Sequence, residues 1–548
     1  MGQGLARVGP VRIGKRLMVL AATYIILLVA FVQLGSAMNT DWQVERYQDH
    51  IKVDTRKTAI ASTKGPTTPE GTYKVRESQI QIELAPGHAI DAIVRQPVGA
   101  PGPRPACLFI HGAGTGKASE VYGDLASAMA SAGITTLVPD KRLDTYSTLH
   151  RNYEAMSRDY DKSFEKLRSW PGVNPAMVGI YAESEGTWIS SIMTARRHDV
   201  AYTILTSAPV YPGRQQMPMA ATSYLDLIKA PSGIMKVIPK LLGMDFSSLG
   251  LEYADFESLP YLDHITQPTL VNYGTDDVSM PVEQGAREIM CRTRDAGNRN
   301  VTVRYYPTNH QIRTGSRLAK DGLPLESHYT HDLEDWINGV AEGTGADQWA
   351  TPMIAGSSPN QLFAAPQETS PGLLRSLNTL LILMVGGPVL LLLALLSSCG
   401  TALAAWVRKR KLQRNPEEAR AGTFGYGSGI AVRLCGLGLG SLVVMGLLVW
   451  YALRVVRHAL TLEPLSSASV AGWTGLRCLA LVLSLVLASL ITRAVIRVPS
   501  NSQEEGTEVL PHGIHLAAGW GHWLTLVLTV TGSIMILATL AFWGLFSF

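Results

Sequence analysis

A serine stands where a sharp turn would expose it. It is Ser184, in the run Met177-Val-Gly-Ile-Tyr-Ala-Glu-Ser-Glu-Gly. The apolar residues before it predict a buried strand, and Ala182 and Gly186 are small enough for the chain to turn abruptly from that strand into a helix. Such a turn presents the hydroxyl for attack on a carbonyl carbon. The pattern therefore predicts nucleophilic catalysis by Ser184.

A carboxylate and an imidazole follow in chain order, each just after a predicted strand. Residues 269–274 precede Asp276 and Asp277, and residues 301–306 precede His310. A neutral imidazole can take the serine proton, and a carboxylate behind the ring fixes its tautomer. We predict His310 as the base and Asp277 as the acid. Asp276 stays as the alternative, because the sequence does not show which carboxylate turns toward the ring.

Three other histidines compete for the role of base. His328 and His331 fall in a predicted helix over residues 327–340, where they are interpreted as surface residues. His111 follows an apolar strand and is interpreted as structural.

The order serine, acid, histidine resembles that of the α/β-hydrolase superfamily. The segment Gly274–Pro281 is similar to the acid loop of that superfamily, and the residues around Ser184 resemble its dienelactone-hydrolase and prolyl-oligopeptidase-like members. The resemblance covers residues 74–342. It implies an α/β fold with a mostly parallel central sheet, helices on both faces and a cap insertion. It also implies a serine hydrolase that uses no cofactor and no metal ion.

A glycine-rich loop upstream completes the resemblance. Residues 106–116 read as a buried strand that opens into glycines, like the oxyanion loop of these hydrolases. The resemblance implies that the backbone N–H groups of Ala113 and Glu185 hold the oxyanion. The side chains of Glu183 and Glu185 are interpreted as structural, with the positioning of a substrate amine or hydroxyl as the alternative for Glu185.

Long apolar runs show that the hydrolase is one part of the chain. The mean hydropathy is +0.12 over 548 residues, which is high for a soluble protein of this length. Five runs come close to the ~20 residues that span a bilayer. They are residues 17–34, 377–399, 434–453, 476–491 and 523–546. The last four predict an all-α transmembrane bundle.

Basic residues predict the orientation of these spans, because lysine and arginine accumulate in cytoplasmic loops. The clusters lie before the first span, after the second and after the fourth: Arg7, Arg12, Lys15, Arg16; Arg408, Lys409, Arg410, Lys411, Arg414; Arg493, Arg497. The hydrolase and the C-terminus are then extracytoplasmic. Arg454, Arg457 and Arg477 run against this trend.

The predicted organisation is a cytoplasmic start, an anchor, the hydrolase and the bundle, joined by linkers. The ranges are 1–16, 17–38 (anchor), 39–73 (linker), 74–342 (hydrolase, with a cap at 209–262), 343–374 (linker) and 375–548 (four spans). Gly35-Ser-Ala37 leaves a cleaved signal peptide as the alternative to the anchor. The apolar, methionine-containing cap predicts contact with an acyl chain or a bilayer, with a cap that only packs on the core as the alternative.

Several classes of function are disfavoured. The five cysteines show neither a disulfide framework nor metal-ligand spacing, and residues 112–117 lack the phosphate-loop signature. The net charge of +4 and the position of the basic clusters beside apolar spans do not favour a nucleic-acid partner.

The sequence thus predicts a multi-pass membrane protein with an extracytoplasmic serine hydrolase that cleaves an ester or thioester of an envelope lipid or acylated glycan. Its partners would be that substrate, membrane lipids and other membrane proteins. An acyltransferase or a peptidase with the same triad stays open, as does a catalytically silent binding or assembly module.

Overall fold

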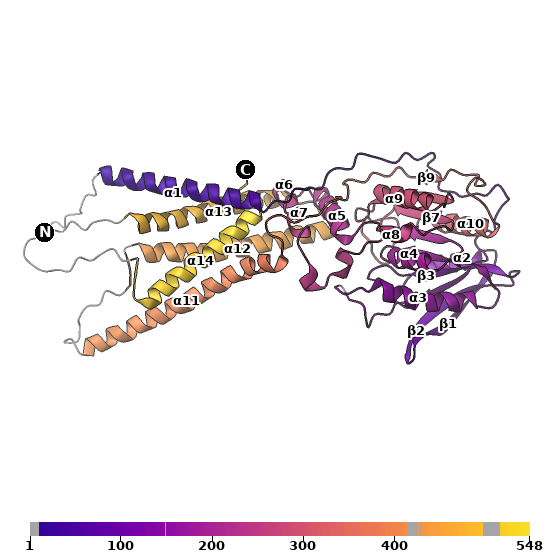
Figure 1. Ribbon diagram of the computed structural model, residues 1–548, viewed down its shortest axis with the longest axis horizontal. Helices are drawn as coiled ribbons and strands as arrows, with labels where there is room; N and C mark the ends of the chain where they lie inside the picture. The colour runs from indigo at the N-terminus through magenta and orange to yellow at the C-terminus, as the bar shows by residue number, and fades with distance from the viewer. Residues whose placement is uncertain are drawn as a thin grey trace, which may run out of the picture. The chain divides into compact units, whose positions relative to one another are not determined.

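The chain folds as two compact units. The computed structural model describes residues 10–114, 116–147, 149–414, 425–427, 429–496 and 516–547 (Figure 1). The sheet unit comprises Trp42–Asp226 and Phe246–Thr369. The helical unit comprises Met1–Asp41, Leu227–Asp245 and Ser370–Phe548. Of the basic residues used to orient the spans, Arg7 and Arg497 lie outside the described residues.

A nine-stranded sheet organises the sheet unit, in the order β1-β2-β4-β3-β5-β6-β7-β8-β9. Its strands are β1 (Lys74–Ala85), β2 (His88–Val98), β3 (Arg104–Ile110), β4 (Thr135–Pro139), β5 (Val173–Glu183), β6 (Thr203–Thr206), β7 (Thr269–Gly274), β8 (Val301–Tyr306) and β9 (Ile354–Gly356). The pairs β1/β2 and β2/β4 are antiparallel, and all later pairs are parallel. The carboxyl ends of β3 and β5 to β8 therefore meet at one edge.

The burial of the strands follows their sequences. Every residue of β4, β6, β7 and β8 is buried, as near-continuous apolar runs predict for strands covered on both faces. Side chains near the end of strand β1 alternate between buried and exposed, since Ile82 and Leu84 are buried and Glu83 is exposed. It lies at the edge of the sheet, where one face meets solvent.

Helices cover both faces of this sheet (Figure 1). Helices α2 (Gly123–Ser131) and α10 (Tyr329–Ala341) pack on one face around a core that includes Phe109 and Trp336. Helices α3 (Tyr153–Arg168), α4 (Gly186–Arg196), α8 (Leu259–Leu262) and α9 (Val282–Asp295) follow each other on the opposite face. The expectation of a mostly parallel sheet between helices is confirmed.

The two segments expected as linkers are bound to the sheet unit. Strand β9 comes from the segment after α10 and extends the sheet beyond β8. The segment before β1 is fixed by the buried carboxylate of Glu283, whose Oε1 accepts from the Ile51 amide at 2.6 Å. Short extended stretches with few apolar residues give little sequence signal, because their pairing depends on partners far along the chain.

Among its described residues, the helical unit contains five helices long and apolar enough to cross a membrane. They are α1 (Pro10–Ala37), α11 (Leu377–Arg414), α12 (Ile430–Thr461), α13 (Ser467–Val495) and α14 (Trp520–Phe542). A short pair of strands, β10 (Gly425–Tyr426) and β11 (Ala517–Ala518), precedes α12 and α14. The first four apolar runs predicted from the sequence lie within α1, α11, α12 and α13, whereas the fifth, residues 523–546, continues past the end of α14 at Phe542.

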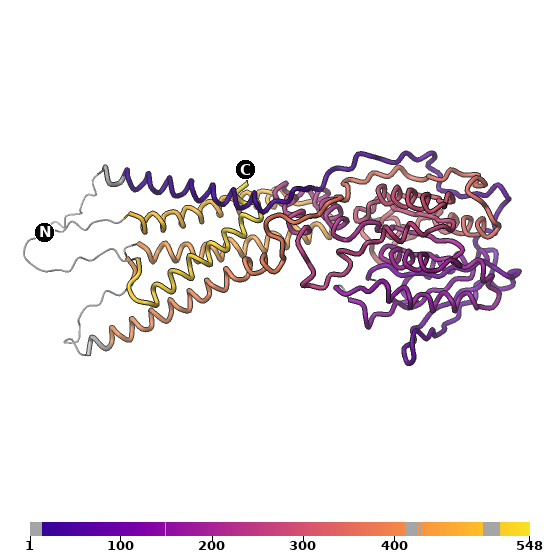
Figure 2. Tube along the Cα trace, in the orientation of Figure 1, coloured from indigo at the N-terminus to yellow at the C-terminus, as the bar shows by residue number. Residues whose placement is uncertain are grey.

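Helix α1 packs within this unit. It lies beside α13 and α14, from the opposite end of the chain (Figure 2). Phe31 stacks on Phe546 with 5.0 Å between ring centroids. A Cβ atom on Gly35 would lie 2.8 Å from the Ala541 carbonyl oxygen, so glycine permits the close approach to α14. The retained anchor stays a prediction, which N-terminal sequencing of the mature protein would test.

The described basic residues used for orientation gather at one end of the bundle. The start of α1, with Lys15 and Arg16, lies at the same end as the finish of α11 and of α13 (Figure 1). At the opposite end α1 finishes and α11 begins, where the Leu373 amide donates to the Ala37 carbonyl. The links to the sheet unit leave from this second end.

Part of the expected cap belongs to the helical unit. Of residues 209–262, α5 (Gly213–Leu227) lies in the sheet unit up to Asp226, whereas α6 (Ser232–Met235) and α7 (Val237–Leu242) lie in the helical unit. Val237 and Met244 are buried there with Leu380 and Phe542. Lys240 Nζ donates to the Phe542 carbonyl at 3.0 Å and so caps the C-terminus of α14.

Candidate active site

Ser184 occupies a strained turn between β5 and α4. Its φ of 53° is in the left-handed region, which is uncommon for a residue with a side chain. The turn is fixed because the Ser184 amide donates to the Thr206 carbonyl at 2.9 Å. A Cβ atom on Gly186 would lie 2.6 Å from the Ile110 carbonyl oxygen, so only glycine fits there. Backbone strain at a single polar residue, as at Ser184, is typical of functional sites.

Asp277 and His310 meet at the same edge of the sheet. Asp277 follows β7 and His310 follows β8, and His310 Nδ1 lies 2.6 Å from Asp277 Oδ2. The other carboxylate oxygen, Oδ1, accepts from the Ser279 amide at 2.9 Å and from the Ser279 hydroxyl at 2.6 Å. The Asp277 side chain is only 1% exposed. These contacts hold both the carboxylate and the ring in one orientation.

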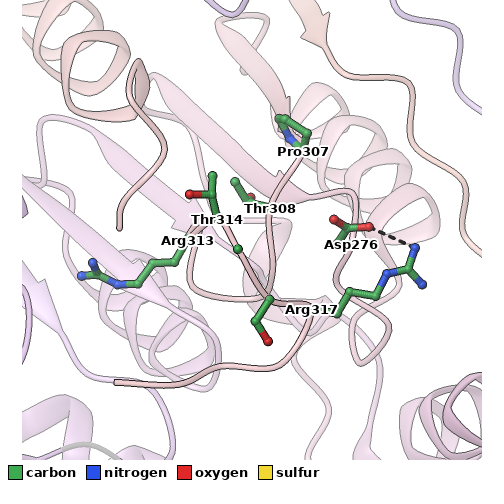
Figure 3. A pocket seen from close by; sticks show the side chains of 8 residues that line it. Asp276, Pro307, Thr308, Arg313, Thr314 and Arg317 are labelled. Atoms are coloured by element: carbon green, nitrogen blue, oxygen red, sulfur yellow. Dashed lines mark ion pairs between the residues drawn. The ribbon is translucent and has the colours of Figure 1, made fainter. Parts of the chain in front are cut away.

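Asp276 turns the other way. Its Oδ1 lies 3.2 Å from Arg317 Nη2, on a pocket lined by the loop after β8 (Figure 3). The Asp276 side chain is 40% exposed. The backbone also separates the two acids, since the Asp276 amide donates to the Thr308 carbonyl and the Asp277 amide to the Gly274 carbonyl. The geometry thus favours Asp277 over Asp276 as the partner of His310.

Ser184 and His310 are linked through β6, which lies between their strands in the sheet order. Ser207, just after β6, donates its hydroxyl to the His310 carbonyl at 2.6 Å. Within the described ranges, no hydrogen bond joins the Ser184 hydroxyl to the His310 ring. Such catalytic hydrogen bonds are often long before substrate binds.

Charge around His310 favours the protonated ring. Burial lowers the pKa of His310, but the carboxylates of Asp277 and Glu183 outweigh burial, and the pKa lies above its ordinary value. For Asp277, burial raises the pKa, and His310 together with Ser279 reverses that shift, so the pKa is lowered. Burial raises the pKa of Glu183 to about 7 against the opposing effect of His310 and Arg313.

The effect of Glu183 on the pKa of His310 predicts in which direction the pH profile moves when Glu183 is replaced. The Glu183 carboxylate stabilises the imidazolium, so Glu183→Gln is expected to lower the pKa of His310. The neutral ring, which can accept a proton from Ser184, then persists to lower pH. The acidic limb of the pH profile of kcat/KM should therefore move to lower pH. Asp276→Asn is the matched control, and an acidic limb that does not move in Glu183→Gln would contradict this assignment.

Glu185, which follows the nucleophile position, forms a buried charged cluster. Its Oε1 accepts from Arg151 Nη1 at 2.7 Å and from the Tyr153 hydroxyl at 2.9 Å. Its Oε2 accepts from Lys141 Nζ at 3.0 Å and from the Tyr146 hydroxyl at 2.8 Å. With four donors on one carboxylate, its role is structural, and no oxygen is left to position a substrate amine or hydroxyl.

The same cluster holds the glycine-rich loop. Lys141 Nζ also donates to the Gly112 carbonyl at 2.9 Å, so one buried ammonium links the loop after β3 to the turn at Ser184. Burial lowers the pKa of Lys141, opposed by Glu185. Ala113 is exposed just beyond this contact. Glu185 is the N-cap of α4, and backbone N–H groups at a helix start have no acceptor within the helix.

The competing histidines do not join this site. His111 is fully buried, its Nε2 lies 2.6 Å from the Pro139 carbonyl oxygen, and burial lowers its pKa to about 4. His328 is the N-cap of α10 and is exposed, as is His331 in the first turn of that helix.

Sequence reasoning did not foresee Lys141, Arg151 or Ser279. Lys141 and Arg151 stand in the loop between β4 and α3, where a basic residue normally predicts solvent contact. Ser279 had a weak signal, because a serine two residues after an aspartate often donates to its carboxylate in a turn.

The chain was compared with known protein families, curated proteins and solved structures. Residues 159–314 match the family described as BAAT / acyl-CoA thioester hydrolase C terminal. No match to this chain is found among curated proteins.

Solved structures similar to the chain include an esterase of Pyrococcus furiosus, with 16% identity over 49% of this chain and 91% of that one, at a TM-score of 0.32. A dienelactone hydrolase-like promiscuous phosphotriesterase from metagenomic libraries has 12% identity over 50% of this chain and 100% of that one, at a TM-score of 0.34. An acylaminoacyl peptidase of Pyrococcus horikoshii has 18% identity over 43% of this chain and 37% of that one, at a TM-score of 0.32.

The strand order and the helices on both faces define a domain of the α/β-hydrolase fold, and residues 159–314 within it match the thioester hydrolase family. In this chain the domain is joined to helices that are long and apolar enough to span a membrane.

Proposed function

We propose that the protein is a membrane-anchored serine hydrolase that cleaves an ester or thioester bond through Ser184, His310 and Asp277. The observation that carries the proposal is the hydrogen bond of 2.6 Å between His310 Nδ1 and the buried Asp277 Oδ2, at the edge of the sheet where Ser184 occupies its strained turn. Acyl transfer needs an oriented imidazole and a fixed serine, and here both stand at the same edge of the sheet.

The reaction has two halves. In the first, His310 Nε2 takes the proton of Ser184 as Oγ bonds to the substrate carbonyl carbon, and the negative oxygen is held by the N–H groups of Ala113 and Glu185. The carbonyl re-forms, the bond to the alcohol or thiol breaks, and His310 returns the proton to that leaving group. In the second half, water attacks the acyl-serine in the same way and releases a carboxylic acid.

The family match favours thioesters and esters over peptides, because its description names an acyl-CoA thioester hydrolase. Residues 227–245 favour a substrate with an acyl chain. This stretch of the expected cap is apolar and belongs to the unit of apolar helices. An ester of a membrane lipid or of an acylated glycan fits both features.

The substrate class is tested with the full-length protein in detergent. We expect kcat/KM to be higher for nitrophenyl palmitate and a palmitoyl thioester than for nitrophenyl butyrate, and negligible turnover of an aminoacyl anilide. Preference for the anilide would make the protein a peptidase. Transfer of the acyl group to an added alcohol in preference to water would make it an acyltransferase.

We propose that the hydrolase domain lies on the extracytoplasmic side. The described basic clusters gather at one end of the helical unit, and the links to the sheet unit leave from the other, so the positive-inside rule places these links outside. A reporter fused near residue 412 should be protected from an external protease. Cleavage of that reporter in intact cells would contradict this orientation.

A further inference from the structure

A second cluster of chemically active side chains lies on α10, outside the proposed triad. Its members are Glu70, His331 and Glu334, each of which offers one ligand atom, and these atoms all lie within 4.8 Å of one another. His331 and Glu334 are three residues apart on α10, so they project from the same helix face. Glu70 reaches them from the segment before β1. All three belong to the sheet unit.

Among the three residues of this cluster, Glu334 gives the strongest indication of a bound ligand. It is only 1% exposed, and its Oε1 has no hydrogen-bond partner among the described residues. The charged groups that act on it most strongly, Glu70 and Asp335, are both acidic. A buried carboxylate without a donor or a cation is costly, since it loses its hydration and gains nothing in return. Either a proton or a bound cation must compensate for that loss.

The other two members are held in place to share a cation. His331 Nδ1 lies 3.6 Å from Glu70 Oε2, which is longer than a hydrogen bond and close to the roughly 3.3 Å between two ligands of one tetrahedral zinc ion. The Thr330 hydroxyl donates to Glu70 Oε2 at 2.8 Å and fixes that carboxylate. The side chains of His331 and Glu70 are 54% and 32% exposed, so an ion could reach the site from solvent.

We propose that Glu70, His331 and Glu334 form a binding site for a divalent transition-metal ion of the Zn²⁺ class. One imidazole and two carboxylates suit zinc, whereas Ca²⁺ and Mg²⁺ prefer oxygen ligands alone. Water fills the remaining position on the exposed side. The ion joins the segment before β1 to α10, where Thr67 also bonds to Asp335 and Lys64 Nζ donates to the Glu342 carbonyl at 2.9 Å.

Metal binding to the full-length protein in detergent tests this site. After treatment with a chelator and its removal, Zn²⁺ is titrated by calorimetry into wild type, Glu334→Gln, Glu70→Gln and the control His328→Ala. Wild type and the control should bind one Zn²⁺ per chain. Both glutamine variants should lose at least about 10-fold in affinity, since removal of even an outer-shell partner costs 10- to 100-fold. Ca²⁺ should bind far more weakly than Zn²⁺.

Thermal unfolding supplies a second readout. With free Zn²⁺ at 100 times its Kd, the Tm of wild type should rise by about 5 °C or more, because the ion binds only the folded form. Glu70→Gln, whose side chain is partly exposed, should keep the near-UV circular dichroism of wild type but show no rise. Equal zinc affinity in wild type and Glu70→Gln, or no zinc bound by wild type, would overturn the proposal and leave Glu334 as a buried protonated acid.

Discussion

Asp277→Asn is expected to lower kcat by about 10,000-fold while the protein stays folded. An amide at this position donates as well as accepts, so it allows the wrong tautomer of His310 and no longer balances the charge of the imidazolium. The effect should be large because His310 Nδ1 has this one carboxylate at 2.6 Å, and Asp277 is fixed by two hydrogen bonds from Ser279. The rate is measured with a nitrophenyl ester.

Asp276→Asn is the matched control for this experiment. Asp276 is the neighbouring residue, has the same chemistry and pairs with Arg317 instead of His310. Its substitution should leave kcat within about two-fold of wild type, since a partly exposed ion pair contributes little. Equal losses in the two variants would mean that the loop after β7 was disturbed as a whole. A larger loss in Asp276→Asn would reverse the assignment of the acid.

Glu185→Gln is expected to reduce the free energy of unfolding by about 3 to 5 kcal/mol. The substitution leaves Lys141 and Arg151 without their carboxylate, and their side chains are only 1% and 16% exposed. Two buried cations then repel one another with no counter-charge. Thermal unfolding in detergent, followed by near-UV circular dichroism, measures the change.

Asp255→Asn supplies the comparison for Glu185→Gln. Asp255 also pairs with an arginine, Arg214, at 2.7 Å, but its side chain is 65% exposed. Solvent screens this pair, so its loss should cost less than about 1 kcal/mol. If the two variants unfold at the same temperature, the cluster around Glu185 does not hold the turn at Ser184 to the glycine-rich loop.

The contribution of Glu185 to the free energy of unfolding should change with pH in a predictable direction. Burial raises the pKa of Glu185, but Lys141 and Arg151 outweigh burial and lower it. A carboxylate with a lowered pKa stabilises the fold above its unfolded pKa. That stabilisation is lost as the pH falls through the folded value, so wild type and Glu185→Gln should differ less in strongly acidic buffer than at neutral pH.

Much of the fold could be predicted because its strands and helices are indicated by short sequence patterns within each segment. Each buried parallel strand is a short apolar run followed by a turn, and the sheet is mostly parallel, as the resemblance implied. The five apolar helices were equally clear, since length and lack of charge identify them. Strand β9 and the role of residues 227–245 were not predictable, because they depend on contacts between distant parts of the chain.

The site was predictable only to the level of its loops. Sequence placed Ser184 and His310 after their strands, but the choice between Asp276 and Asp277 depends on backbone hydrogen bonds that no local pattern specifies. Lys141 and Glu334 carry charges that sequence alone assigns to the surface, and their burial follows from tertiary packing. Arg151 is partly buried for the same reason.

The central claim is that Ser184 is an activated nucleophile. We would label the purified full-length protein in detergent with a fluorophosphonate probe, beside Ser184→Ala and a heat-denatured sample. The proposed mechanism predicts labelling of the folded wild type alone, because only a serine whose proton is taken by His310 attacks the probe. Absence of labelling in well-folded wild type, or equal labelling of Ser184→Ala, would contradict the mechanism and favour a catalytically silent binding module.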